Sequence, residues 1–128
     1  MSKKEKESLA ITIQIIASIA SIGTIIISII LLYNEQLEIN EEEPFLDAET
    51  AQKLTTFNRV LILIIFIIFL IINYVLYDIS KKEGEDLKPY KLQIVASYFS
   101  LFAAFIALYV VLLQRSGEQV VDVENPII

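Results

Sequence analysis

The chain has 128 residues, of which 55% are hydrophobic, and a formal net charge of -6. This composition is too apolar for an ordinary soluble domain of that length and indicates an integral membrane protein. The absence of Cys, His and Trp excludes disulfides, thiolate or imidazole metal sites, and Ser-His or Cys-His catalysis. The acidic balance argues against nucleic-acid binding, and we expect neither a cofactor nor a metal.

Three long apolar runs, residues 9–32, 60–77 and 92–113, contain no charged residue and no proline. As helices they would be roughly 36, 27 and 33 Å long, against about 30 Å for the hydrocarbon core of a bilayer. Buried helices of a soluble protein are the alternative, but too little of the chain remains to cover them. The first run is longer than a signal-peptide core, which favours an uncleaved anchor. The sequence therefore predicts an all-α bundle of three transmembrane helices.

The positive charges predict the orientation of these spans. Seven of the ten Lys and Arg residues lie in the arm 1–8 and the loop 78–91, whereas three lie in the loop 33–59 and the tail 114–128. We therefore expect a multi-pass protein of the cell membrane with its N-terminus inside and its C-terminus outside. The tail is expected to be a solvated extension.

The segments that join the spans are expected to be partly helical. Asp47 has the properties of a helix N-cap, and the helix could run from there to about Ile79, leaving only residues 40–46 as a connection. The outer loop would then be an acidic helical hairpin. Its tip carries Glu41, Glu42 and Glu43, which could attract cations, although a solvated charge run is the simpler interpretation. Gly84 suits the end of the second helix.

Small and hydroxyl-bearing residues recur along one face of two spans. In lipid, such faces allow helices to approach closely and pack, so we expect them inside the bundle, with a pore-lining role as the alternative. In the third span, aromatic residues occupy the opposite face. The predicted packing residues are Ala17, Ser21, Thr24 and Ser28 in the first span, and Ala96, Ser100, Ala103 and Ala107 in the third.

Three amide side chains, those of Gln14, Asn73 and Gln93, lie in the half of the spans nearest the predicted cytoplasm. A primary amide in hydrocarbon needs a hydrogen-bonding partner, which predicts an interhelical polar layer that joins at least two of them. Two alternatives are a polar constriction or substrate site, and, for Gln93 alone, simple contact with interfacial water.

No ionisable side chain lies within a span, which argues against proton relays and ion-coupled transport. No nucleotide-binding or hydrolase motif occurs. The leading hypothesis is a non-enzymatic membrane subunit that forms homo-oligomers or docks on a membrane-protein partner. The alternative is a small oligomeric cation channel or holin-like pore, and a membrane enzyme is third. In hydropathy the chain resembles three-span phage holins, but those run from outside to inside and have basic tails, whereas the tail 114–128 is acidic.

Overall fold

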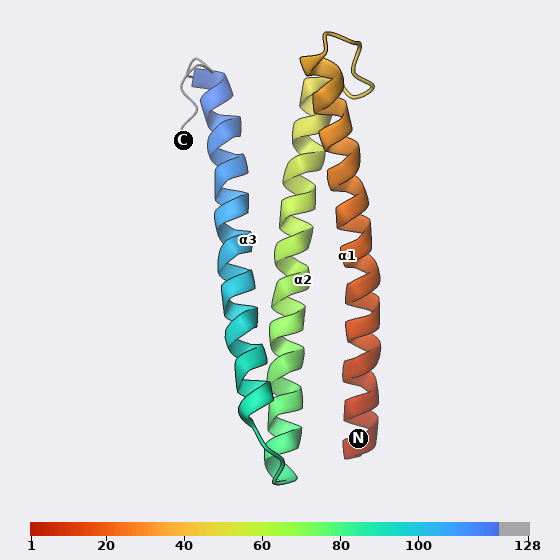
Figure 1. The fold of residues 1–128 in the computed structure, drawn as a ribbon, viewed down its shortest axis with the longest axis vertical. Helices are drawn as coiled ribbons and strands as arrows, with labels where there is room; N and C mark the ends of the chain where they lie inside the picture. The colour runs from red at the N-terminus through yellow and green to blue at the C-terminus, as the bar shows by residue number, and fades with distance from the viewer. Residues whose placement is uncertain (121–128) are drawn as a thin grey trace.

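The computed structural model describes residues 1–120, with side chains through Gln114, and contains three long helices. These are α1 (Lys3–Ile39), α2 (Ala48–Lys82) and α3 (Lys88–Val120), which run alternately up and down (Figure 1). Each has a stretch long and apolar enough to cross a membrane, and the described residues contain no strand. The prediction of an all-α protein with three candidate spans is confirmed. The last residues of the predicted tail, 121–128, lie outside the described part.

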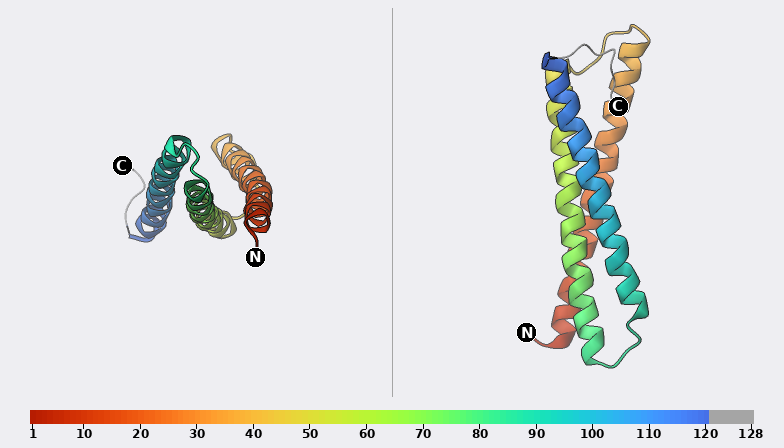
Figure 2. Two further views of the ribbon diagram at one scale, coloured as in Figure 1. Left: turned by 90° about the horizontal axis from the view of Figure 1, so that it is seen from below. Right: turned by 90° about the vertical axis from the view of Figure 1, so that its left-hand side faces the viewer.

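The three helices form an open arrangement in which α2 lies between the other two (Figures 1 and 2). α2 packs against both α1 and α3, whereas α1 and α3 do not pack against each other. Every contact between spans therefore involves α2, and large parts of α1 and α3 are left facing outward.

Side-chain caps fix where the helices begin. The hydroxyl of Ser2 accepts a hydrogen bond from the amide of Glu5 at 3.1 Å, and the carboxylate of Glu5 accepts one from the amide of Ser2 at 3.2 Å. This capping box makes the arm 1–8 helical from Lys3 onward. At the start of α2, the carboxylate of Asp47 accepts a hydrogen bond from the amide of Thr50 at 2.7 Å, which confirms the predicted N-cap.

The hydrogen bond from Thr50 holds the pKa of the Asp47 carboxyl below its ordinary value of 3.8, because it favours the charged form. A carboxylate at this position also interacts favourably with the positive end of α2. A lowered pKa in the folded state means that the cap is fully effective above about pH 3.8 and is lost as the pH falls through the lowered value. Above that pH the contribution of the Asp47 cap to stability stays constant.

The turn between α1 and α2 is held against the end of α1. Asn34 is only 2% exposed, and its side-chain oxygen accepts a hydrogen bond from the amide of Leu46 at 3.0 Å. The ring of Tyr33 lies beside that of Phe45, with 6.0 Å between their centres. These contacts hold the short connection between α1 and α2 against the last turns of α1, which continues beyond its apolar run.

The ends of α1 and α2 use the same backbone motif with different residues. After α1, the amides of Glu41 and Glu42 donate to carbonyls of the last turn at 3.0 and 2.8 Å, and Glu41 has a φ of 59°. After α2, the amides of Gly84 and Glu85 do the same at 3.2 and 3.1 Å, and Gly84 has a φ of 72°. This is the Schellman motif, in which a left-handed residue ends the helix. Glycine adopts that conformation without strain, whereas glutamate adopts it at a cost in conformational energy.

Two substitutions at these helix ends should therefore change stability in opposite directions. Glu41→Gly should raise the free energy of unfolding by about 0.5–1 kcal/mol, because it relieves left-handed strain at some cost in chain entropy. Gly84→Ala should lower it by about 1 kcal/mol. The added methyl group would meet no atom within 4 Å, so that loss would arise from the backbone alone. Reversible unfolding in mixed micelles, followed by circular dichroism, measures both; a loss of stability in Glu41→Gly would contradict the explanation.

Candidate functional site

Buried residues recur at seven-residue intervals on all three helices. A seven-residue repeat keeps one face of each helix turned toward its neighbour and is typical of left-handed helix packing. On α1 and α3 the buried residues are mostly small, which lets the backbones approach the isoleucines of α2. The buried rows are Ala10, Ala17 and Thr24 on α1, Asn58, Ile65, Ile72 and Ile79 on α2, and Ser97, Ala104 and Val111 on α3.

Asn58 connects α2 to α1 in the half of the contact that lies nearer the turn between these helices. Its side-chain amide donates hydrogen bonds to the carbonyl of Thr24 at 3.2 Å and to the hydroxyl of Ser28 at 3.0 Å. The residue is 2% exposed, and its side-chain oxygen has no hydrogen-bond partner in the described part of the chain. Because α1 and α2 are antiparallel, equal steps along both helices then place Ile65 near Ala17. Asn58 thus fixes the register of the two helices.

The sequence prediction missed Asn58, because it placed residues 33–59 in the outer loop. The available signal was the seven-residue spacing that Asn58 shares with Ile65, Ile72 and Ile79. Such a spacing predicts that a polar residue belongs to the same packed face as the apolar residues that follow it.

A second polar contact joins α2 to α3. The amide of Asn73 donates a hydrogen bond to the hydroxyl of Ser97 at 2.5 Å, and that hydroxyl donates to the carbonyl of Gln93 at 3.0 Å. One residue further along each helix, the hydroxyls of Tyr74 and Tyr98 lie 2.7 Å apart. Asn73 therefore takes part in an interhelical polar contact, and its partner is a serine that the sequence prediction did not single out.

The two glutamines of the predicted polar layer lie elsewhere. Gln14 is half-buried on α1 and Gln93 is exposed on α3. Among the described residues, no hydrogen bond joins the side chain of either glutamine to Asn73 or to the other glutamine. The contact seen between α2 and α3 is thus made by an amide and a hydroxyl rather than by two amides.

The predicted small-residue faces lie at, or next to, the contacts with α2. On α1, Ala17 and Thr24 are buried, and Ser21 and Ser28 are half-buried. The hydroxyls of the three hydroxyl-bearing residues of this face donate to carbonyls of α1 itself. On α3, the half-buried members are Ser100 and Ala107, and the exposed ones are Ala96 and Ala103.

A cleft of about 610 Å³ at the end of the bundle that carries the turn between α1 and α2, which we call the outer cleft, is lined by residues of all three helices. α1 contributes Ser28 and Glu35, and α3 contributes Ala107 and Gln114, so these residues face the space between the two outer helices. α2 contributes Asn58 and Arg59.

The side of α1 and α3 that lines this cleft continues along both helices, away from the turn between α1 and α2. Seven-residue steps along a packed helix stay on one side of it, so the same side continues through Ser21 and Gln14 on α1 and through Ser100 and Gln93 on α3. We call this surface the polar face. It consists of Gln14, Ser21, Ser28 and Glu35 on α1, and of Gln93, Ser100, Ala107 and Gln114 on α3.

The glutamates of the acidic tip are not arranged as a metal-binding site. Glu41, Glu42 and Glu43 are all exposed. Within the described residues, no group of three or more acidic side chains is placed so that it could hold a metal ion. Attraction of cations to this tip therefore rests on its net charge alone.

No protein-family model, no curated protein and no solved structure matches this chain. Its three candidate spans indicate a small multi-pass membrane protein. What this membrane protein does must be inferred from its helix faces.

The contact between Asn73 and Ser97 can be tested with a double-mutant cycle. Asn73→Ala and Ser97→Ala should each lower the free energy of unfolding, and together they should lower it by less than the sum. The expected coupling is about 0.6–1.7 kcal/mol, as for hydrogen bonds between membrane helices. Unfolding in mixed micelles provides the measurement. Ser100→Ala is the matched control, because the amide of Asn73 donates to Ser97 and no hydrogen bond to Ser100 is found among the described residues. Equal coupling for both serines would refute the assignment.

Proposed function

We propose that the chain is a non-enzymatic membrane subunit that self-associates through the polar face. One observation carries the proposal: α1 and α3 pack only against α2, which leaves a surface of hydroxyl and amide groups between them without a covering helix. In lipid, surfaces of small and polar residues are the ones through which helices associate. A second copy of the chain would offer the same groups in return.

The energetic basis is the cost of unpaired polar groups in hydrocarbon. The side-chain amide of Gln14 has two donors and an acceptor, and among the described residues none of them is hydrogen-bonded. Leaving such a group in an apolar medium costs several kcal/mol in transfer experiments, roughly 4–8 kcal/mol for complete removal from hydrogen-bonding surroundings. Association that pairs Gln14 with a neighbouring copy would recover part of that cost.

The proposed orientation places the first residues of α1 and the turn 83–87 in the cytoplasm. The lysine-rich flanks support this orientation, because positive residues are retained on the cytoplasmic side. The turn between α1 and α2, with its acidic tip, would then project outside the cell membrane. In an assembly of several copies, these acidic tips would come together on the outer side.

Self-association predicts crosslinked species of discrete mass in native membranes. Crosslinking should yield multiples of 14.6 kDa. Ala107→Leu, which enlarges a residue of the polar face, should shift the distribution toward the monomer. Val95→Leu is the matched control, because Val95 is 49% exposed and does not line the outer cleft. A monomer alone, or a crosslinked partner of another mass, would contradict self-association.

The second candidate is a small cation channel, and the hydroxyls of the polar face favour it. If several copies turned this face toward a common axis, Ser21, Ser28 and Ser100 would line a pore. The outer loop, with a net charge of -5 over residues 33–59, would concentrate cations at its mouth. Single-channel recordings of the purified protein in planar bilayers distinguish the two functions, since a closely packed assembly conducts no ions.

A further inference from the structure

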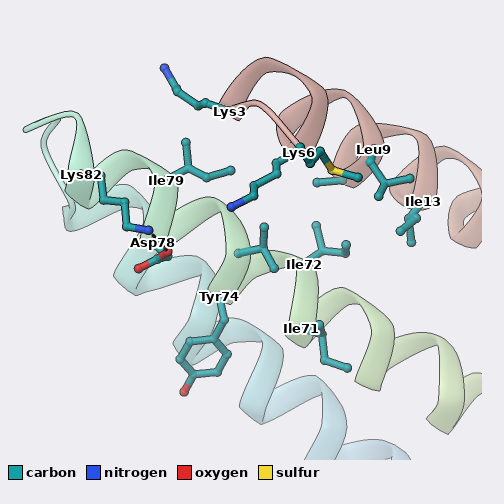
Figure 3. A pocket seen from close by; sticks show the side chains of 13 residues that line it. Lys3, Lys6, Leu9, Ile13, Ile71, Ile72, Tyr74, Asp78, Ile79 and Lys82 are labelled. Atoms are coloured by element: carbon teal, nitrogen blue, oxygen red, sulfur yellow. Dashed lines mark ion pairs between the residues drawn. The ribbon is translucent and has the colours of Figure 1, made fainter.

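A second cleft, of about 700 Å³, lies between α1 and α2 at the end of the molecule where α1 begins (Figure 3). It has the size of a ligand-binding cavity, and no described residue of α3 lines it. Its walls are mostly isoleucine and leucine side chains, and it is also lined by three lysines and one aspartate. The walls include Leu9, Ala10, Ile13, Ile72 and Ile79, and the charged residues are Lys3, Lys6, Lys82 and Asp78.

The three lysines differ in their partners within the protein. Lys82 is paired with Asp78 at 3.3 Å, and Lys3 is paired with Glu83. Lys6 has no carboxylate partner among the described residues. Figure 3 shows the side chain of Lys6 reaching from α1 toward α2, with its ammonium group between the two helices. Of the three lysines of the cleft, only Lys6 is therefore left without a carboxylate partner in the described part of the chain.

The position of the cleft along α1 matches the layers of a bilayer. Lys6 precedes the apolar run that begins at Leu9, so its ammonium group lies at the level of lipid headgroups, while Leu9, Ile13 and Ile72 of the walls lie at the level of acyl chains. Ala10 lies near Ile72 in the α1–α2 register set by Asn58, and both residues line the cleft.

We propose that this cleft binds an anionic phospholipid, with one acyl chain against Leu9, Ile13 and Ile72 and the phosphate beside Lys6. The charge of the edge selects the headgroup, since a net negative lipid gains an ion pair that a zwitterionic lipid does not. The apolar walls select a lipid over a soluble phosphate, which would leave them uncovered. Because α3 contributes nothing to this cleft, the proposal does not depend on self-association through the polar face.

Quenching of a single tryptophan by brominated lipids tests this site, because the chain has no Trp of its own. Leu9→Trp, in vesicles of phosphatidylcholine and phosphatidylglycerol, should be quenched more strongly when the bromine is on the phosphatidylglycerol than when it is on the phosphatidylcholine. We expect about a fivefold preference, which corresponds to one lysine near an anionic headgroup. Ile13→Trp gives a second reporter on the same wall, and helical content by circular dichroism shows that both variants are folded.

Matched variants distinguish lipid binding in the cleft from a general attraction of anionic lipids to the positive charge of the protein surface. Lys6→Gln should abolish the preference, whereas Lys4→Gln, on the same helix but outside the cleft, should keep it. A tryptophan at Ile26, which is 52% exposed and distant from the cleft, should be quenched equally by both lipids. Equal quenching at both Leu9→Trp and Ile13→Trp would overturn the proposal, as would an equal loss of preference in Lys4→Gln and Lys6→Gln.

Discussion

The contact of α2 with both neighbours holds the three spans together, because α1 and α3 do not touch. Lipid tails are as apolar as isoleucine, so these contacts gain little from the hydrophobic effect and must rely on close packing and hydrogen bonds. The rows of buried residues supply both. Ala10, Ala17 and Ala104 let the backbones come close, and Asn58 and Asn73 each make a hydrogen bond to a different neighbour. One asparagine therefore fixes the register of each antiparallel pair.

The number, position and type of the helices could be predicted from the sequence, because long uncharged runs have one stable form in lipid. The N-cap at Asp47 and the turn at Gly84 could also be predicted, since both depend on local residue chemistry. The capping box of Ser2 and Glu5 was present as a local pattern and was overlooked. Hydropathy measures transfer into lipid and gives no information on how far a helix continues into water. The apolar run alone therefore could not give the ends of α1, which extends beyond that run in both directions.

The packed faces were harder to predict, and α3 shows why. Ser97 and Ala104 follow Ala96 and Ala103 by one residue, so two neighbouring rows of small residues run along the same helix. Composition cannot distinguish these rows, which lie about 100° apart around the helix axis. The choice is made by α2, whose Asn73 needs a hydroxyl at the height of Ser97. For Asn58, the seven-residue spacing with Ile65, Ile72 and Ile79 indicates the packed face, but its partners Thr24 and Ser28 depend on the register of α1, which that spacing does not give.

The same α1–α2 contact ends in two chemically different openings. Near the turn between α1 and α2, Asn58 donates a hydrogen bond to α1 beside a polar cleft that α3 also lines. At the opposite end, where α1 begins, alanine and isoleucine line a cleft that Lys6 also lines. A polar opening in a bilayer favours protein groups that can complete its hydrogen bonds, whereas an apolar opening beside an unpaired lysine favours an anionic lipid. The two openings lie at opposite ends of the α1–α2 contact and share no lining residue, so a lipid bound as we propose would leave the outer cleft open to a neighbouring copy.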